Sequence, residues 1–252
     1  MALALLLAIS AAAVTHAVVQ RKDGLIVHFD AEFSPHSLPR QGSAPIQVTI
    51  KGAVATADGS HPPPLKVLEI KLNRNGRIYT KGLPSCSPSR LQSTTTGEAK
   101  SRCGSALVGR GNFRAEVELG TNNPVAAAGE VLAFNGRVAG KPGLLLHFFG
   151  GAPVRFTLVV PLLIGHHRDR EFGTVLRTRI PKLANGFGSI TQIELSLGRR
   201  WHFAGKPRSY LSAGCNAPAG FPVVPFAFAE AKFRFEGHSE ISSELEKTCR
   251  AR

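Results

Sequence analysis

Acidic residues are scarce in this chain of 252 residues, and aspartate occurs only four times. The 31 Lys and Arg outnumber the 17 Asp and Glu, which gives a formal net charge of +14. Such an excess favours anionic partners such as acidic polymers, anionic lipid surfaces or nucleic acid. The basic residues are dispersed, however, and no run of five Lys or Arg occurs. The alternative is therefore that the positive charge only keeps the protein soluble.

Familiar catalytic motifs are missing as well. The patterns GxSxG, HExxH, GxxxxGK[ST] and GxGxxG do not occur. The one dense group of possible metal ligands is His166-His167 with the two acidic residues that follow. Adjacent residues of a strand point to opposite faces, so a solvated turn explains this pair better than a chelate does. His28 and His147 are interpreted as structural residues within strands, and we assign no catalytic residue, metal ligand or cofactor.

No apolar run long enough to cross a membrane follows Gln20. The chain instead begins with an apolar stretch at residues 2–14, which has the length of a signal-peptide core. A cleavage site ending at Ala17 fits the preference for small residues there, and a cut after Ala13 is the rival. The start of the chain is therefore interpreted as an export signal.

A membrane anchor is the alternative for the same segment. No charge precedes Arg21, so the basic start that is typical of a signal peptide is missing. The uncharged stretch reaches Val19, which is at the short limit for spanning a bilayer. We assign residues 1–17 as a signal peptide or N-terminal membrane anchor, and residues 24–252 as a single β-rich domain.

Cysteine is limited to four residues, and no two of them have CxxC spacing. Export would place them in an oxidising compartment, where an even number of cysteines implies disulfides. Of the three possible pairings we favour the two that are local in sequence, Cys86–Cys103 and Cys215–Cys249. Four buried free thiols are the alternative, and a zinc site is disfavoured because no His lies at ligand spacing from a cysteine.

Alternating hydrophobicity and turn residues are what the chain has in abundance. Stretches such as "GLIVHFDAEF" and "FAFAEAKFRF" alternate apolar and polar positions, and 26 Gly and 17 Pro separate such stretches. Asn75-Gly76 is a hairpin-turn dipeptide. The segment "EISSELEKTC" fits both helical and strand periods, and we favour a strand that pairs with "FAFAEAKFRF". Some ten to twelve short strands predict an all-β fold, mainly an antiparallel β-sandwich or barrel.

One short helix is predicted around residues 95–108. Thr95 and Glu98 have the spacing of a capping box, with Thr95 as the N-cap. A helix that begins there and ends at Gly109 would turn Cys103 inward. The Cys86–Cys103 disulfide would then tie this helix to the sheet that precedes it.

A second hairpin combines basic and aromatic residues and is the candidate binding surface. Such a combination can hold a phosphate, a uronic acid or a sugar ring. The alternative is a solvated hairpin with a core Trp. The anion-binding candidates are Arg199, Arg200, Lys206, Arg208, Trp201 and Tyr210.

Four stretches within residues 33–215 share a distinctive pattern: "FSPHSLP", "PPPLKVLEIKLNRNGRIYTKGLPSC", "AKSRCGSALVGRG" and "RSYLSAGC". The pattern GLPxC…AxxxC…ALVGxG is matched here by Cys86, Cys103, Ala106, Val108 and Gly109. In these stretches the chain resembles an uncharacterised group of exported, cysteine-paired β-rich proteins of high-GC bacteria. The resemblance implies export and paired cysteines, and it implies no activity.

These observations favour an extracytoplasmic, non-enzymatic β-sandwich protein, located outside the cell or in its envelope. An acidic polysaccharide or an anionic lipid is the expected partner, and nucleic acid conflicts with export. The alternative is an exported hydrolase whose site is assembled from distant loops. A deep cleft with a His or carboxylate would favour the enzyme, and a shallow basic face would favour binding.

Overall fold

The computed structural model describes residues 17–118, 124–183 and 188–252. Most of these residues lie in β-strands, which confirms the all-β fold class. Within the described residues, no helix has both the length and the apolar character needed to cross a bilayer. The signal peptide or anchor predicted at residues 1–17 lies, apart from its last residue, outside the described residues.

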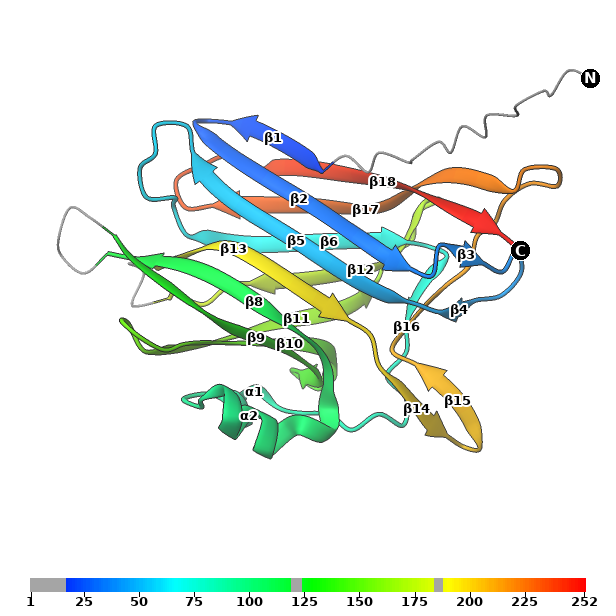
Figure 1. Ribbon diagram of the computed structural model, residues 1–252, viewed down its shortest axis with the longest axis horizontal. Helices are drawn as coiled ribbons and strands as arrows, with labels where there is room; N and C mark the ends of the chain where they lie inside the picture. Colours follow the sequence, from blue (N-terminus) through cyan, green and yellow to red (C-terminus); the bar gives the residue numbers. More distant parts are fainter. Residues whose placement is uncertain (1–16, 119–123, 184–187) are drawn as a thin grey trace, which may run out of the picture.

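In the described part of the chain, thirteen strands hydrogen-bond into one large curled sheet (Figure 1). All pairings are antiparallel except that of the last two strands in the order. In spatial order the strands are β1 (Val18–Lys22), β2 (Leu25–Ser34), β5 (Gln47–Thr56), β13 (Gly188–Leu197), β8 (Leu107–Val117), β9 (Val125–Val138), β10 (Lys141–Gly150), β11 (Phe156–His166), β12 (Phe172–Arg179), β6 (Leu65–Asn73), β17 (Val223–Phe235), β18 (Ile241–Ala251) and β3 (Ser37–Leu38).

The two ends of this sheet meet, so that one face of the curl becomes a shared interior. Strands β1 and β2 contact β18 near the other end of the strand order. The Lys247 ammonium on β18 lies 3.0 Å from an Asp30 carboxylate oxygen and 2.7 Å from a Glu32 carboxylate oxygen on β2. Burial lowers the pKa of Lys247, and the bonds to Glu32 and Asp30 more than offset this, so its pKa is raised. These ion pairs link the two ends of the sheet.

The C-terminal segment is a strand, as predicted, because β18 pairs antiparallel with β17. At the other terminus the sheet starts earlier than the predicted boundary at residue 24. Strand β1 already pairs with β2, from Val18 opposite Phe29 to Lys22 opposite Leu25.

The prediction of a hairpin at Asn75-Gly76 is wrong: a turn forms there, but the two strands that it joins do not pair with each other. Strand β7 (Gly76–Ile78) leaves β6 and pairs with β16 (Leu211–Ala213), which also pairs with β4 (Ala44–Pro45). The Asn73 side chain accepts a hydrogen bond from the Asn75 backbone at 2.9 Å, so the turn is a local one that redirects the chain. The three strands form a small separate sheet at one end of the curl.

The predicted helix forms with its predicted start. It is α2 (Thr96–Cys103), preceded by the single turn α1 (Pro88–Leu91). The Thr95 hydroxyl accepts from the Glu98 backbone N–H at 3.3 Å, and the Glu98 carboxylate accepts from the Thr95 N–H at 2.7 Å. Both halves of the capping box are therefore present.

The helix ends earlier than predicted. Cys103 is its last residue, a 3-10 turn follows at Gly104–Ala106, and β8 already begins at Leu107. Gly109 lies inside this strand, where an added Cβ would come 2.5 Å from the Ser196 carbonyl oxygen. A glycine at position 109 therefore allows neighbouring strands to pack closely, and it does not end the helix.

Both sequence-local disulfides, Cys86–Cys103 and Cys215–Cys249, are present. Cys86 lies against β9, where its N–H donates to the Asn135 carbonyl oxygen at 2.9 Å. The first disulfide thus ties α2 to a loop on β9, a strand that follows in sequence, and not to the preceding sheet. From the sequence separations of 17 and 34 residues, loop entropy predicts stabilisation of about 3 and about 4 kcal/mol.

Candidate binding sites

The interior of the curled sheet contains two cavities, of about 150 Å³ and about 180 Å³. Aliphatic and aromatic side chains line most of both. Protein interiors are normally packed with few voids larger than a water molecule, so two such spaces are notable. The cavities are adjacent, because they share the lining residues Gly52, Leu68, Leu146, Leu162, Ile193 and Phe233.

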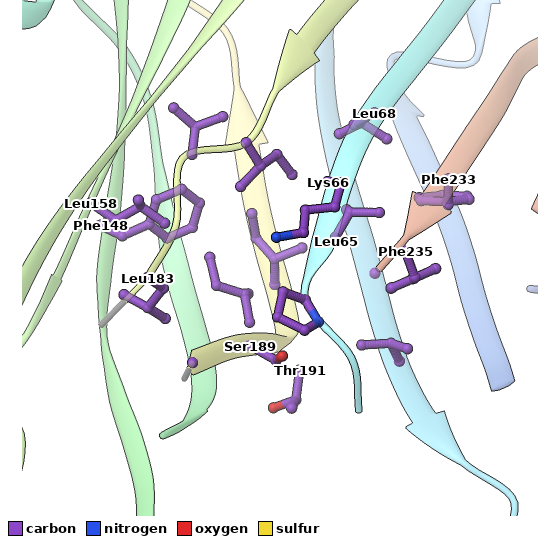
Figure 2. A pocket seen from close by; sticks show the side chains of 18 of the residues that line it. Leu65, Lys66, Leu68, Phe148, Leu158, Leu183, Ser189, Thr191, Phe233 and Phe235 are labelled. Carbon is purple, nitrogen blue, oxygen red and sulfur yellow. The ribbon is translucent and has the colours of Figure 1, made fainter. Parts of the chain in front are cut away.

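Figure 2 shows the smaller cavity, enclosed by side chains from β6, β10, β11 and β17. Leu65 and Leu68 come from β6, and Phe148 faces them from β10. Its polar lining includes Lys66, whose ammonium lies 3.0 Å from a Glu236 carboxylate oxygen. The other polar lining residues are His28, Lys182, Ser189, Thr191 and Gln192, and the remainder of the lining is mainly apolar.

The larger cavity is closed at one end by the small sheet β4–β16–β7. Ile78 and Leu211 are opposite one another in this sheet and line the cavity. Their neighbours Arg77 and Ser212 form the next pair, and successive strand residues point to opposite faces. The small sheet therefore has an apolar face toward the interior and a polar face away from it.

A groove of about 560 Å³ runs along that polar face. Arg74 and Arg77 line it from the β6–β7 segment, His166 from the end of β11, and Arg208 from the hairpin of β14 (Arg200–Phe203) and β15 (Lys206–Ser209). No Asp or Glu side chain lines the groove among the described residues. We call it the cationic groove.

Aromatic stacking holds Arg208 in place. Its guanidinium carbon lies 5.1 Å from the centre of the Tyr79 ring, and that ring is stacked on Trp201 with centroids 6.0 Å apart. The Arg208 Nε is buried and has no hydrogen-bond partner in the described part of the chain. A guanidinium in this position is oriented before any ligand arrives.

The predicted anion-binding residues do not all line this groove. Arg199 donates from Nη1 to the carbonyl oxygens of Ser105 and Leu107 at 2.7 and 2.8 Å, so it has a structural role that anchors the hairpin to the start of β8. Arg200 and Lys206 are exposed on the hairpin. Neither lines the cationic groove.

Tyr210 cannot provide the predicted stacking surface. Its side chain is 0% exposed and belongs to the core of the curl. Burial raises the pKa of its hydroxyl, which has no hydrogen-bond partner among the described residues. Trp201 is half-buried against Tyr79 and does not line the groove. Of the six candidates, only Arg208 lines it.

Sequence reasoning missed Arg74, Arg77 and Tyr79 as members of this site. All three lie in the stretch "RNGRIY", whose Asn75-Gly76 dipeptide predicts a hairpin turn. The basic and aromatic residues there form the same kind of pattern as those of the β14–β15 hairpin. Only the pairing of β7 with β16 brings the two segments together.

His166 and His167 belong to no cluster of metal ligands in the described part of the chain. His166 lines the groove, and His167 lies 3.7 Å from an Asp169 carboxylate oxygen. Within the described ranges, no three His, Cys, Asp or Glu side chains come together as metal ligands.

One histidine–carboxylate pair bears on the hydrolase alternative. His61 Nδ1 lies 3.0 Å from a Glu116 carboxylate oxygen, and Ser189 pairs with Glu116 in the sheet. The Ser189 hydroxyl donates to the Pro62 carbonyl oxygen at 2.6 Å instead of to the imidazole. The three residues are neighbours, but the serine is not bonded to a base.

No family model, curated protein or solved structure matches this chain at a significant level. The candidate sites are therefore interpreted from their own geometry and chemistry. The two disulfides indicate a compartment outside the reducing cytosol.

Proposed function

We propose that this chain is a non-enzymatic binding protein of the extracytoplasmic space that holds the hydrocarbon part of a lipid or similar amphiphile. The observation that carries the proposal is the pair of adjacent apolar cavities inside the curled sheet. An apolar cavity of about 150 Å³ stays dry and can admit a small hydrocarbon. Occupation by an apolar ligand would restore the contacts that the lining side chains lack.

Two further features support this function. The cavities lie between strands from both halves of the sheet, such as β5 and β6, and no helix of the described residues lines either of them. The disulfides fit a protein that works outside the cell or in its envelope, which is the compartment that we propose. A lipid is therefore still the partner that we propose, and its hydrocarbon part is the group that the cavities would bind.

The test is titration of a fluorescent fatty acid into the full chain, compared with its Leu162→Phe variant. Leu162 lines both cavities, so a larger side chain there takes up the space for the ligand. We expect saturable binding by the wild-type chain and a weakening of about tenfold or more in the variant, which is about 1.4 kcal/mol.

Leu163→Phe is the matched control. Leu163 is the next residue of β11 and points to the opposite face of the sheet, so the same change leaves the cavities intact. Affinity within about twofold of wild type is expected, with the thermal midpoint of all three proteins measured in parallel. No saturable binding by the wild-type chain, or equal losses in the two variants, would contradict the proposal.

A further inference from the structure

We propose that the cationic groove is a binding site for a phosphate group, carried either by a lipid head group or by a soluble ligand. Three guanidinium groups line it, those of Arg74, Arg77 and Arg208, and none of the three forms an ion pair within the described residues. Without a carboxylate in the described lining, their charge is not neutralised locally. An anionic ligand would supply the missing charge.

Phosphate fits the donor set because its oxygens can accept hydrogen bonds from several guanidinium groups at once. Guanidinium groups present planar pairs of N–H donors, which bind phosphate oxygens in bidentate fashion. The hydroxyls of Thr174 and Ser212 line the same groove and add neutral donors. Its volume of about 560 Å³ lies within the range of sites for small ligands, about 300–1,000 Å³.

The site is partly organised in advance. Stacking on Tyr79 orients Arg208, and Trp201 supports Tyr79 from the β14–β15 hairpin. A side chain that is ordered before binding loses less conformational entropy when the ligand arrives. In contrast, Arg77 is exposed, so binding would have to order its side chain.

The groove and the apolar interior share the small sheet as a common wall. Four residues line both the groove and the larger cavity: Gly76, Arg77, Ile78 and Ser212. A phosphate in the groove would thus lie next to the space proposed for an apolar chain. The inference goes beyond the proposed function, because the groove faces away from the interior and can bind phosphate whether or not the cavities are filled.

The single tryptophan of the chain provides the measurement. Trp201 is stacked on the Tyr79 ring that carries Arg208, so phosphate binding is expected to change its emission. Inorganic phosphate is titrated in one experiment, and phosphatidylglycerol vesicles in another, with phosphatidylcholine vesicles for comparison. A response to inorganic phosphate indicates a soluble ligand, and a response to phosphatidylglycerol vesicles alone indicates a lipid head group.

The Arg74→Gln/Arg77→Gln double variant tests the site and leaves the Arg208–Tyr79–Trp201 stack intact. Because this variant loses charge-assisted hydrogen bonds, its affinity for the phosphate source that binds the wild-type chain is expected to fall by at least about tenfold. Arg179→Gln/Arg234→Gln is the control, because it removes the same charge from two exposed residues of the outer sheet face, which are both opposite Val67. The control is expected to bind within about twofold of wild type.

Two results would overturn the inference. One is the same loss of affinity in both double variants, which would assign binding to the overall charge of +14. The other is no saturable response to either phosphate source by the wild-type chain. Binding of the fluorescent fatty acid is measured on the same proteins and on Arg74→Gln alone, because Arg74 lines the groove and neither cavity. A weaker phosphate response with retained fatty-acid binding in Arg74→Gln separates this inference from the proposed function.

Discussion

Strands β9 and β10 have two buried faces, and the two differ in how well they are packed. One face lies beneath α1 and α2, where Leu132, Phe134 and Leu145 are fully buried in a small cluster that also contains the Cys86–Cys103 disulfide. We call this cluster the helix-side core. The other face is turned to the interior of the curl, where Leu144 and Leu146 line cavities. The same kinds of side chain thus form a closed core on one face and an open space on the other.

The difference follows from what covers each face. Short helices can approach a sheet until their side chains fill every gap, and a disulfide holds α2 there. The inner face is covered by other strands of the same sheet, whose distance is set by hydrogen bonding and curvature and not by side-chain size. A void in the interior is therefore built into the curl, and the space proposed for a ligand results from backbone geometry.

Adjacent leucines of β10 give the largest expected contrast. Leu145 is 0% exposed in the helix-side core, and Leu146 is 7% exposed and lines both cavities. Leu145→Ala is expected to lower the free energy of unfolding by about 4 kcal/mol and Leu146→Ala by about 2 kcal/mol, because a cavity-lining side chain has fewer contacts to lose. Urea denaturation with the disulfides intact measures both values.

Enlarging the same two side chains is the control for this prediction. Leu145→Phe overpacks a filled core and is expected to cost about 2–3 kcal/mol, whereas Leu146→Phe extends into empty space and is expected to cost less than about 1 kcal/mol. Equal costs for the two enlarged variants would show that the interior is as well packed as the helix-side core, and the comparison would fail.

A buried histidine makes the helix-side core sensitive to pH. His147 is 0% exposed, and burial lowers its pKa below the usual value of 6.5. Thr94 Oγ1 donates to the Leu91 carbonyl oxygen, so His147 Nε2 carries the proton and donates to Thr94, and its Nδ1 has no partner among the described residues. Protonation would place an uncompensated charge in the core.

The sign of the effect follows from this lowered pKa. Below pH 6.5 the unfolded chain binds a proton that the folded chain refuses, so stability is complete above that pH and falls as the pH decreases, by up to about 1.4 kcal/mol per unit. His147→Gln is expected to remove this part of the pH dependence. Denaturation curves across the acid range, taken as the difference between variant and wild type, provide the check, and parallel curves would contradict it.

The smallest expected effect concerns the start of α2. Thr95→Ala removes the hydroxyl that caps the helix and is expected to lower stability by about 1 kcal/mol. Fatty-acid binding in the interior should not change, since α2 covers the opposite face of β9 and β10. Thr96→Ala is a suitable control, because Thr96 is already inside the helix. A loss of binding in the Thr95 variant would show that the two faces are coupled.

Much of the fold could be predicted because its signals are local. Alternation along each strand predicts which face is apolar, and Thr95 and Glu98 set the helix start by direct hydrogen bonds across three residues. The disulfide pairs could be chosen by proximity in sequence. The candidate site could not be predicted in this way, since Tyr210, which the sequence predicts to be a stacking surface, lies in the core directly after β15.

By itself, the sequence determined the all-β class, the capped helix and the positions of both disulfides, because each depends on residues close together in the chain. Tertiary structure decided which strands became neighbours. The Asn75-Gly76 turn is compatible with a hairpin or with a strand that leaves for another partner, and long-range pairing with β16 selected the second. That selection placed Arg77 and Arg208 in the lining of one groove and closed one end of the larger cavity. Cavities and convergent charges depend on distances between strands that no local pattern encodes.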